Sequence, residues 1–141
     1  MKVAEANKAL VREAFEQVWN LRQVDRIPDF YSPEFVAVYP QFGPPRRGHI
    51  GLKQWVEGIW SSSPEYHEEL HELVAEGDLV VARLTISGIR RVQWGELPST
   101  KLGSAEEILI LRIRQDKIVW QHGVVDVLHV LRGPGLIPAS S

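Results

Sequence analysis

Apolar residues recur at helical spacing through the first half of the chain. Positions 10, 11, 14, 15 and 18 form one apolar stripe, which predicts an amphipathic helix over residues 4–20. A short second helix is predicted around residues 24–31, where Pro28 fits only in the first turn. The segment EFVAVYP predicts a strand closed by Pro40, and the helical spacing returns over residues 49–61.

The second half of the chain is typical of strands. Residues 66–75 fit a strand or a helix by pattern, and a strand is favoured because the turn EGD and the β-rich run LVVARLTISG follow. Residues 105–114 and 117–125 flank QD, a two-residue hairpin turn, and residues 88–103 form a long loop or an irregular hairpin tip. Helices followed by strands indicate an α+β fold, with a curved mixed or antiparallel sheet wrapped over the N-terminal helices around an internal pocket.

Composition narrows the class of protein. The 141 residues fit one domain, with a core over about residues 5–132 and a tail at 133–141 that we expect to be flexible. A formal net charge of −2 argues against a dedicated nucleic-acid binder. The absence of cysteine excludes disulfides, thiolate metal sites and a cysteine nucleophile. The sequence carries no signal-peptide pattern and no membrane-spanning stretch, so we expect a cytoplasmic protein.

One carboxylate stands in an apolar run near the end of the chain. Asp126 lies within WQHGVVDVLHV, and a buried, unpaired carboxylate is costly. One interpretation is a general acid/base at the inner end of the last strand, with its pKa raised by apolar neighbours. The other is the N-cap of a short helix that begins at Val127. These interpretations predict opposite pKa shifts, because a cap stabilises the ionised form.

The order of several segments resembles the SnoaL-like polyketide cyclases, within the wider nuclear-transport-factor-2-like superfamily. The segments that carry this resemblance are ALVREAFEQVWN, YSPEF, GLKQWVEGIW, LVAEGDLVVARLTISG and above all DKIVWQHGVVDVL. The resemblance implies a cone-shaped fold with an internal cavity, a homodimer, and catalysis without a metal or organic cofactor. It also implies that an aspartate near the end of the last strand, at the place of Asp126, acts as general acid/base in an aldol ring closure.

Other candidate residues follow from strand alternation and from the many aromatic residues. His122 is the expected catalytic partner of Asp126, because alternation places Ile118, Trp120, His122 and Val124 on one face of a strand; a structural histidine bonded to the backbone is the alternative. The candidate substrate-binding residues are Tyr39, Trp19, Trp60, Arg83, Trp94, Glu107 and Trp120. For the aromatic residues the alternative is core filling or a dimer interface, and for Arg83 it is the solvent face. The five histidines lack the spacing of a metal site.

These observations predict a cofactor-independent general acid/base enzyme that acts on a small hydrophobic carbonyl compound, as an aldol-type cyclase or an isomerase. A non-catalytic ligand-binding or dimerisation module is the alternative from another class, since one fold hosts many functions. Epoxide hydrolysis is a third possibility, if Asp126, Glu107 and Arg83 meet. The expected partners are a small hydrophobic molecule and a second copy of the chain, with no nucleic acid and no membrane.

Overall fold

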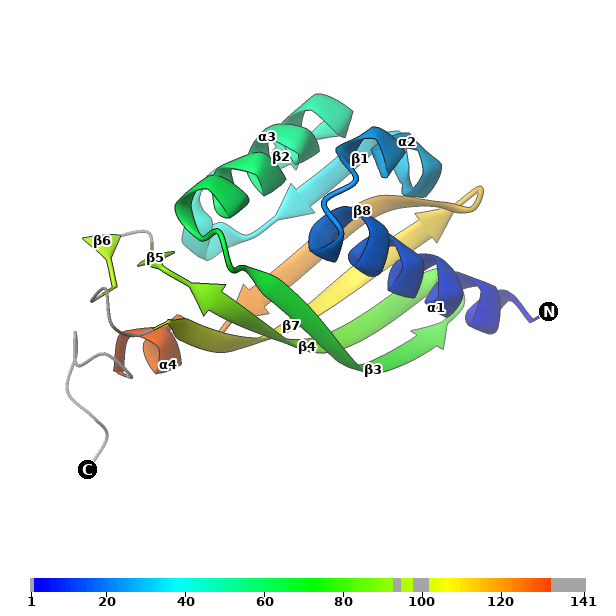
Figure 1. Ribbon diagram of the computed structural model, residues 1–141. Helices are drawn as coiled ribbons and strands as arrows, with labels where there is room; N and C mark the ends of the chain where they lie inside the picture. The colour runs from blue at the N-terminus through cyan, green and yellow to red at the C-terminus, as the bar shows by residue number, and fades with distance from the viewer. Residues whose placement is uncertain (1, 93–94, 98–101, 133–141) are drawn as a thin grey trace.

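A computed structural model describes residues 2–92, 95–97 and 102–132 of the chain (Figure 1). The helical elements are α1 (Val3–Ala14), the π-helical turn η1 (Phe15–Asn20), η2 (Val24–Arg26), α2 (Ile27–Phe30), η3 (Pro40–Phe42), α3 (Gly48–Ser62) and α4 (Val127–Arg132). The strands are β1 (Tyr31–Val38), β2 (Arg46–Arg47), β3 (His67–Glu76), β4 (Leu79–Ile89), β5 (Arg91–Val92), β6 (Gly95–Glu96), β7 (Gly103–Arg114) and β8 (Lys117–Val125).

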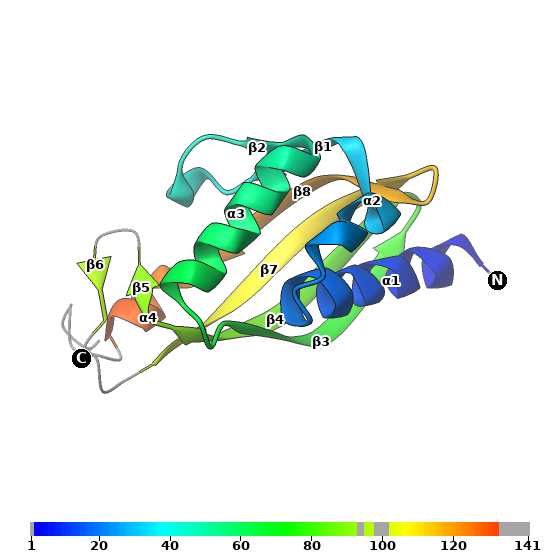
Figure 2. The same ribbon diagram turned by 45° about the horizontal axis from the view of Figure 1, so that its top comes forward.

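Six strands form one curved sheet in the order β2-β1-β8-β7-β4-β3. Neighbouring strands are antiparallel except β1 and β8, which are parallel, so the expected mixed sheet is confirmed. Helices α1, α2 and α3 lie on one face of this sheet, whereas α4 lies at the end remote from the N-terminus, near the hairpin β5–β6 (Figure 2). The helices and the concave face of the sheet therefore enclose the interior of the molecule.

Side chains alternate between the interior and the outer face along the long strands. On β7 every second residue from Gly103 to Ile113 is buried, and on β4 the same holds from Val80 to Gly88. The interior positions pack against Val11 of α1 and against Leu52 and Val56 of α3, all fully buried. Burial of these apolar side chains is the main force that holds helices and sheet together.

An irregularity in β8 changes which residues face the interior. The register between β7 and β8 shifts between Ile118 and Trp120, so alternation does not continue across this point. Ile118 is buried, but beyond the bulge it is Gln121 that points inward, at 2% exposure. The prediction that Ile118 shares a face with Trp120, His122 and Val124 is therefore wrong, because one extra residue inverts the parity of the strand.

Most element predictions are confirmed, with small differences at the boundaries. Residues 66–75 are a strand, Pro28 lies in the first turn of α2, and the helix predicted over residues 4–20 ends in the π-helical turn η1. Gln115 and Asp116 have φ angles of 51° and 61°, as a two-residue hairpin turn requires. The loop predicted at 88–103 carries the hairpin β5–β6, and its residues 93–94 and 98–101 lie outside the described structure, as does the predicted tail. No helix within the described ranges is long and apolar enough to cross a membrane.

Candidate active site

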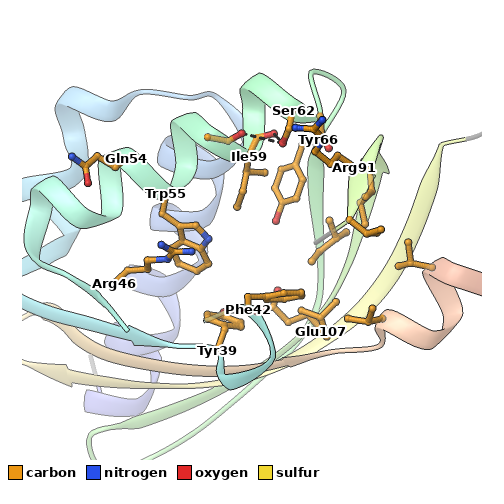
Figure 3. Close-up of a pocket in the computed structure, with 18 of the residues that line it drawn as sticks. Tyr39, Phe42, Arg46, Gln54, Trp55, Ile59, Ser62, Tyr66, Arg91 and Glu107 are labelled. Carbon is orange, nitrogen blue, oxygen red and sulfur yellow. Dashed lines mark hydrogen bonds between the residues drawn. The ribbon is translucent and has the colours of Figure 1, made fainter. Parts of the chain in front are cut away.

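A cavity of about 640 Å³ lies between α3, the sheet and α4 (Figure 3). This volume falls in the range of small-molecule sites. Most of its wall is aliphatic or aromatic, and Tyr39, Tyr66 and Glu107 point into it. The other lining residues are Phe42, Pro45, Arg46, Arg47, Gly51, Gln54, Trp55, Gly58, Ile59, Ser62, Ser63, Ile86, Ile89, Arg91, Val92, Val125, Val127 and Val130. The cavity is suited to a mainly apolar ligand with a few polar groups.

Glu107 is held in the wall of this cavity by a chain of side-chain hydrogen bonds. It occupies an interior position of β7 and is 5% exposed. The Tyr39 hydroxyl donates to Glu107 Oε2 at 2.5 Å and accepts a hydrogen bond from Gln121 Nε2 at 2.7 Å. Both hydrogen-bonding functions of the Tyr39 hydroxyl are thus used, and they fix one oxygen of the carboxyl group.

A second buried glutamate lies behind the first. Glu68, on β3, is 7% exposed and its Oε2 accepts a hydrogen bond from the Tyr66 hydroxyl at 2.7 Å. A closed cavity of about 20 Å³ is lined by both glutamates, Tyr66 and Gln121, among others. Glu68 Oε1 and Gln121 Oε1 are buried and accept no hydrogen bond from any described residue. The two carboxyl groups therefore share a buried interior that is rich in hydrogen-bond acceptors.

This environment favours the neutral form of both carboxyl groups. Burial raises the pKa of Glu107 to about 7, although the hydrogen bond from Tyr39 opposes the shift. Burial, together with repulsion from Glu107, raises the pKa of Glu68 to about 8. The pKa values of Tyr39 and Tyr66 also rise well above their usual value because both hydroxyls are buried, so both remain hydrogen-bond donors. Glu107 is poised to lose and regain a proton near neutral pH.

Two residues outside the cavity wall fix this arrangement. Asn20, at the end of η1, pairs with the backbone of the edge strand β3: its Nδ2 donates to the carbonyl oxygen of Glu68 at 2.8 Å, and its Oδ1 accepts from the Glu68 N–H at 2.9 Å. Gly123 leaves room for the ring of Tyr39, since a Cβ at this position would lie 2.1 Å from Tyr39 Cε1. The side chain of Asn20 thus fixes the backbone at Glu68, and the absence of a side chain at Gly123 gives Tyr39 its place.

Aromatic rings fill the space between α1 and the cavity. Trp55 packs against Tyr39 and against Trp19, with ring centroids 5.1 Å apart in each pair. Trp19 is 3% exposed and its Nε1 donates to the Tyr31 hydroxyl at 3.1 Å. Trp19 lines the small closed cavity and not the large one, so it acts here as packing, whereas Trp55 lines both.

The structure places Asp126 outside this cavity. Asp126 is exposed, and its Oδ1 accepts a hydrogen bond from the His129 N–H at 3.1 Å in the first turn of α4. This is the geometry of the N-cap, the second of the two interpretations of the sequence. The expected burial among apolar side chains is not found, because β8 ends at Val125 and the chain leaves the sheet there.

Several other predicted site residues lie on the outer face of the sheet. His122 and Trp120 are neighbours there, with ring centroids 5.8 Å apart, and neither lines the cavity. Arg83 also faces outward, where it bridges Glu72 and Glu106 at 2.7 and 2.6 Å. Asp126, Glu107 and Arg83 therefore do not meet as epoxide hydrolysis would require. Arg83 pairs with Glu106 on the outer face, whereas Glu107 faces the cavity.

The two remaining tryptophans of the prediction are not cavity residues in the described structure. The guanidinium carbon of Arg22 lies over the ring of Trp60, 5.3 Å from the ring centroid. Trp60 does not line the cavity. Trp94 lies outside the described residues. Of the predicted residues, the structure brings together Tyr39 and Glu107.

Sequence reasoning missed Glu68, Gln121 and Tyr66. Glu68 carried one signal, because it is one of two adjacent glutamates in an alternating strand and one of them must face inward. Gln121 carried none, since its inward position depends on the bulge in β8. Within the described ranges, no three histidine, aspartate or glutamate side chains gather as a metal site.

The comparisons with known proteins agree with this architecture. A family model described as SnoaL-like polyketide cyclase matches residues 9–133. No curated protein matches the chain. Among solved structures, a putative SnoaL-like polyketide cyclase from Jannaschia sp. CCS1 is similar over 98% of this chain and 97% of its own, with 15% identity and a TM-score of 0.82.

Two proteins from Streptomyces are similar to the same extent. TsrD from Streptomyces laurentii is 22% identical over 97% of this chain and 99% of its own, with a TM-score of 0.79. AclR, a putative hydroxylase from Streptomyces galilaeus, is 22% identical over 96% and 99%, with a TM-score of 0.76. These likenesses confirm the predicted cone-shaped α+β fold. Because the family model spans most of the sequence, the chain belongs to the SnoaL-like polyketide cyclase family.

Proposed function

We propose that the protein catalyses proton transfer on a small, mainly apolar carbonyl compound, with Glu107 as the general acid/base. The observation that carries this proposal is the buried Glu107 carboxyl group in the wall of a 640 Å³ apolar cavity, held by the hydroxyl of Tyr39. A titratable group with a pKa near neutrality in a concave apolar site fits general acid/base catalysis. This assigns to Glu107 the role that the sequence assigned to Asp126.

The reaction moves one proton, which Glu107 takes from the substrate and later returns to it. The ionised carboxyl group takes a proton from the carbon next to a substrate carbonyl, and the C–H electron pair forms an enolate. In an aldol closure the enolate carbon attacks a second carbonyl of the same molecule, and Glu107 returns its proton to the new alkoxide. In an isomerisation of a β,γ-unsaturated carbonyl compound, deprotonation gives a conjugated dienolate, and Glu107 returns the proton to its γ carbon while the double bond moves into conjugation with the carbonyl group. Apolar walls exclude water and strengthen the electrostatic interactions of the reacting groups.

Each polar neighbour has a definite part in this proposal. Tyr39 orients the carboxyl group and stabilises its ionised form through its hydrogen bond, while Gln121 holds Tyr39. The aromatic wall formed by Trp55 and Phe42 orients a flat or cyclic substrate. No step of this chemistry requires a metal or an organic cofactor.

The test is hydrogen–deuterium exchange at the carbon next to a carbonyl. We would incubate 2-tetralone, a bicyclic ketone, with the protein in D2O and follow loss of its proton signal by NMR. We expect Glu107→Gln to slow the exchange by about 10²–10⁴-fold. Glu106→Gln is the matched control, because Glu106 is exposed on the opposite face of the same strand.

A third variant separates the two candidate carboxylates. Asp126→Asn preserves a good helix N-cap, so we expect it to fold and to keep full exchange activity. If Asp126→Asn abolishes exchange and Glu107→Gln does not, the assignment of the acid/base to Glu107 is wrong. If both variants keep the exchange rate of the wild type, neither carboxylate is the acid/base and the proposed mechanism is wrong. If the wild type shows no exchange, the protein is a ligand-binding module rather than this kind of enzyme.

We also propose that the protein forms a homodimer through the outer face of the sheet. Four large apolar side chains are 38–63% exposed on this face: Val81, Ile108, Ile110 and Val124. Trp120 and His122 lie on the same face of the sheet. A second copy of this surface would shield these residues from water and would give His122 and Trp120 a structural role at an interface.

A further inference from the structure

The cavity has an unequal distribution of charge. Of the described residues that line it, three are arginines, and Glu107 alone is acidic. Arg91 is already paired with Glu96 at 3.0 Å. Glu107 is about half neutral at neutral pH and largely neutral below it, since burial raises its pKa to about 7. The interior therefore carries excess positive potential on the side of β2, where the two remaining arginines lie.

The register of β2 places Arg46 on the interior face of the sheet. Arg46 is paired with Ala37 of β1, whereas Arg47 is paired with Val36. Residues directly opposite each other in an antiparallel pair share a face, and Ala37 is 1% exposed. Arg46 thus points inward and is half-buried, whereas Arg47 is exposed at the rim of the cavity.

Arg46 has no compensating anion in the described structure. It is half-buried, lies on the same side of the cavity as Trp55 (Figure 3), and makes no ion pair or side-chain hydrogen bond with a described residue. A half-buried guanidinium group in a mainly apolar cavity, with its N–H donors free of any described partner, is suited to bind an anion. The first turn of α3 adds to the effect, because Gly51 lies close to the backbone of Arg46 and a helix N-terminus is partially positive.

We propose that Arg46 binds a carboxylate of the substrate, so that the natural ligand is an apolar carbonyl compound that also carries a carboxylic acid. The guanidinium group matches a carboxylate in two parallel hydrogen bonds. The apolar body of the ligand then lies along Trp55 and Ile59, with its reactive carbonyl toward Glu107 (Figure 3). This inference rests on the proposed function for the role of Glu107, and it adds the chemical class of the substrate and its orientation.

Binding of two matched probes tests the inference. 2-Naphthoate and 2-naphthamide have the same apolar body, and only the first is an anion at neutral pH. By isothermal titration calorimetry we expect the wild type to bind the carboxylate about tenfold more tightly than the amide. Arg46→Gln should abolish this preference while its affinity for the amide stays close to that of the wild type.

Lys53→Gln is the matched control, since it also removes one positive charge, from an exposed residue of α3 that does not line the cavity. We expect it to keep the preference for the carboxylate. The inference is wrong if the wild type shows no preference or binds neither probe. It is also wrong if Arg46→Gln keeps the preference, or if Lys53→Gln loses it to the same degree.

These outcomes are independent of turnover. A protein that prefers the carboxylate through Arg46 but exchanges no protons contradicts the proposed acid/base function and leaves the anion site standing. A protein that exchanges protons through Glu107 but binds both probes equally contradicts the anion site alone.

Discussion

Replacing Glu68 with glutamine should make the protein more stable at alkaline pH. Glu68 is buried, accepts one hydrogen bond from Tyr66, and leaves its Oε1 without a donor among the described residues. Glutamine has nearly the same shape, can still accept the Tyr66 hydrogen bond, and never becomes charged. The substitution therefore removes the ionisation of a buried group and little else.

The magnitude follows from the difference between the folded and unfolded pKa values. Burial raises the pKa of Glu68 from 4.5 to about 8. A difference of one pH unit corresponds to about 1.4 kcal/mol, so full ionisation of Glu68 opposes folding by at most about 5 kcal/mol. Relaxation and water entry relieve part of this penalty, and we expect Glu68→Gln to raise the free energy of unfolding by about 2–4 kcal/mol near pH 8.

The direction of the pH dependence of stability follows from proton binding. Between pH 4.5 and about 8 the folded state keeps a proton on Glu68 that the unfolded state has lost. The free energy of unfolding therefore falls as the pH rises through this window, and the contribution of Glu68 is fully favourable only below about pH 4.5. The raised pKa of Glu107 also makes the free energy of unfolding fall as the pH rises, up to about pH 7. Stability should thus be greater in mild acid than in mild base.

Urea unfolding followed by tryptophan fluorescence measures this effect. The wild type should lose stability from about pH 5 to about pH 8, whereas Glu68→Gln should show a shallower decline and should match the wild type near pH 5. Glu69→Gln is the control, because Glu69 is exposed on the opposite face of the same strand. The reasoning is refuted if wild-type stability rises across this range, or if Glu68→Gln is the less stable protein at pH 8.

Three further predictions concern the same structure. Tyr39→Phe removes the hydrogen bond that lowers the pKa of Glu107, so the pH dependence of proton exchange should move to higher pH, and the protein should lose about 1–3 kcal/mol of stability by urea unfolding. Gly123→Ala should displace the Tyr39 ring, so we expect the free energy of unfolding to fall by about 1–3 kcal/mol and proton exchange on the substrate to slow. An unchanged free energy of unfolding would show that the ring can move freely. Ile108→Glu should convert the dimer to a monomer in light scattering, while Ile50→Glu, also exposed but on α3, should not; equal masses for both variants would contradict the proposed interface.

The local pattern of apolar, polar and turn-forming residues was sufficient to predict most of the secondary structure. Helical spacing gave the helices at the N-terminus and over Gly48–Ser62, because each presents one continuous apolar stripe to the sheet. The turn at Gln115–Asp116 and the strands on either side were predictable because tight turns depend on a few neighbouring residues. The curved mixed sheet over N-terminal helices followed from the order of these elements together with the resemblance to the family.

Parity along β8 was not predictable, and the candidate site depended on it. A bulge near residue 119 has no clear sequence signal, because any residue can occupy it when the neighbouring strand permits. Its consequence is large: Gln121 replaces His122 on the interior face. Strand alternation requires one of the adjacent Glu106 and Glu107 to face inward, and the structure identifies Glu107.

The sequence by itself determined the type and order of the elements, the turn at the β7–β8 hairpin and the capping capacity of Asp126, since these depend on residues a few positions apart. The tertiary structure alone decided which carboxyl groups are buried together. Glu68 and Glu107 are 39 positions apart in the printed sequence and lie on strands separated by β4. They line one small cavity only because the order and register of β3, β4 and β7 place both on the interior face of the curved sheet. Their proton affinity depends on distance and on loss of water, which no local pattern encodes.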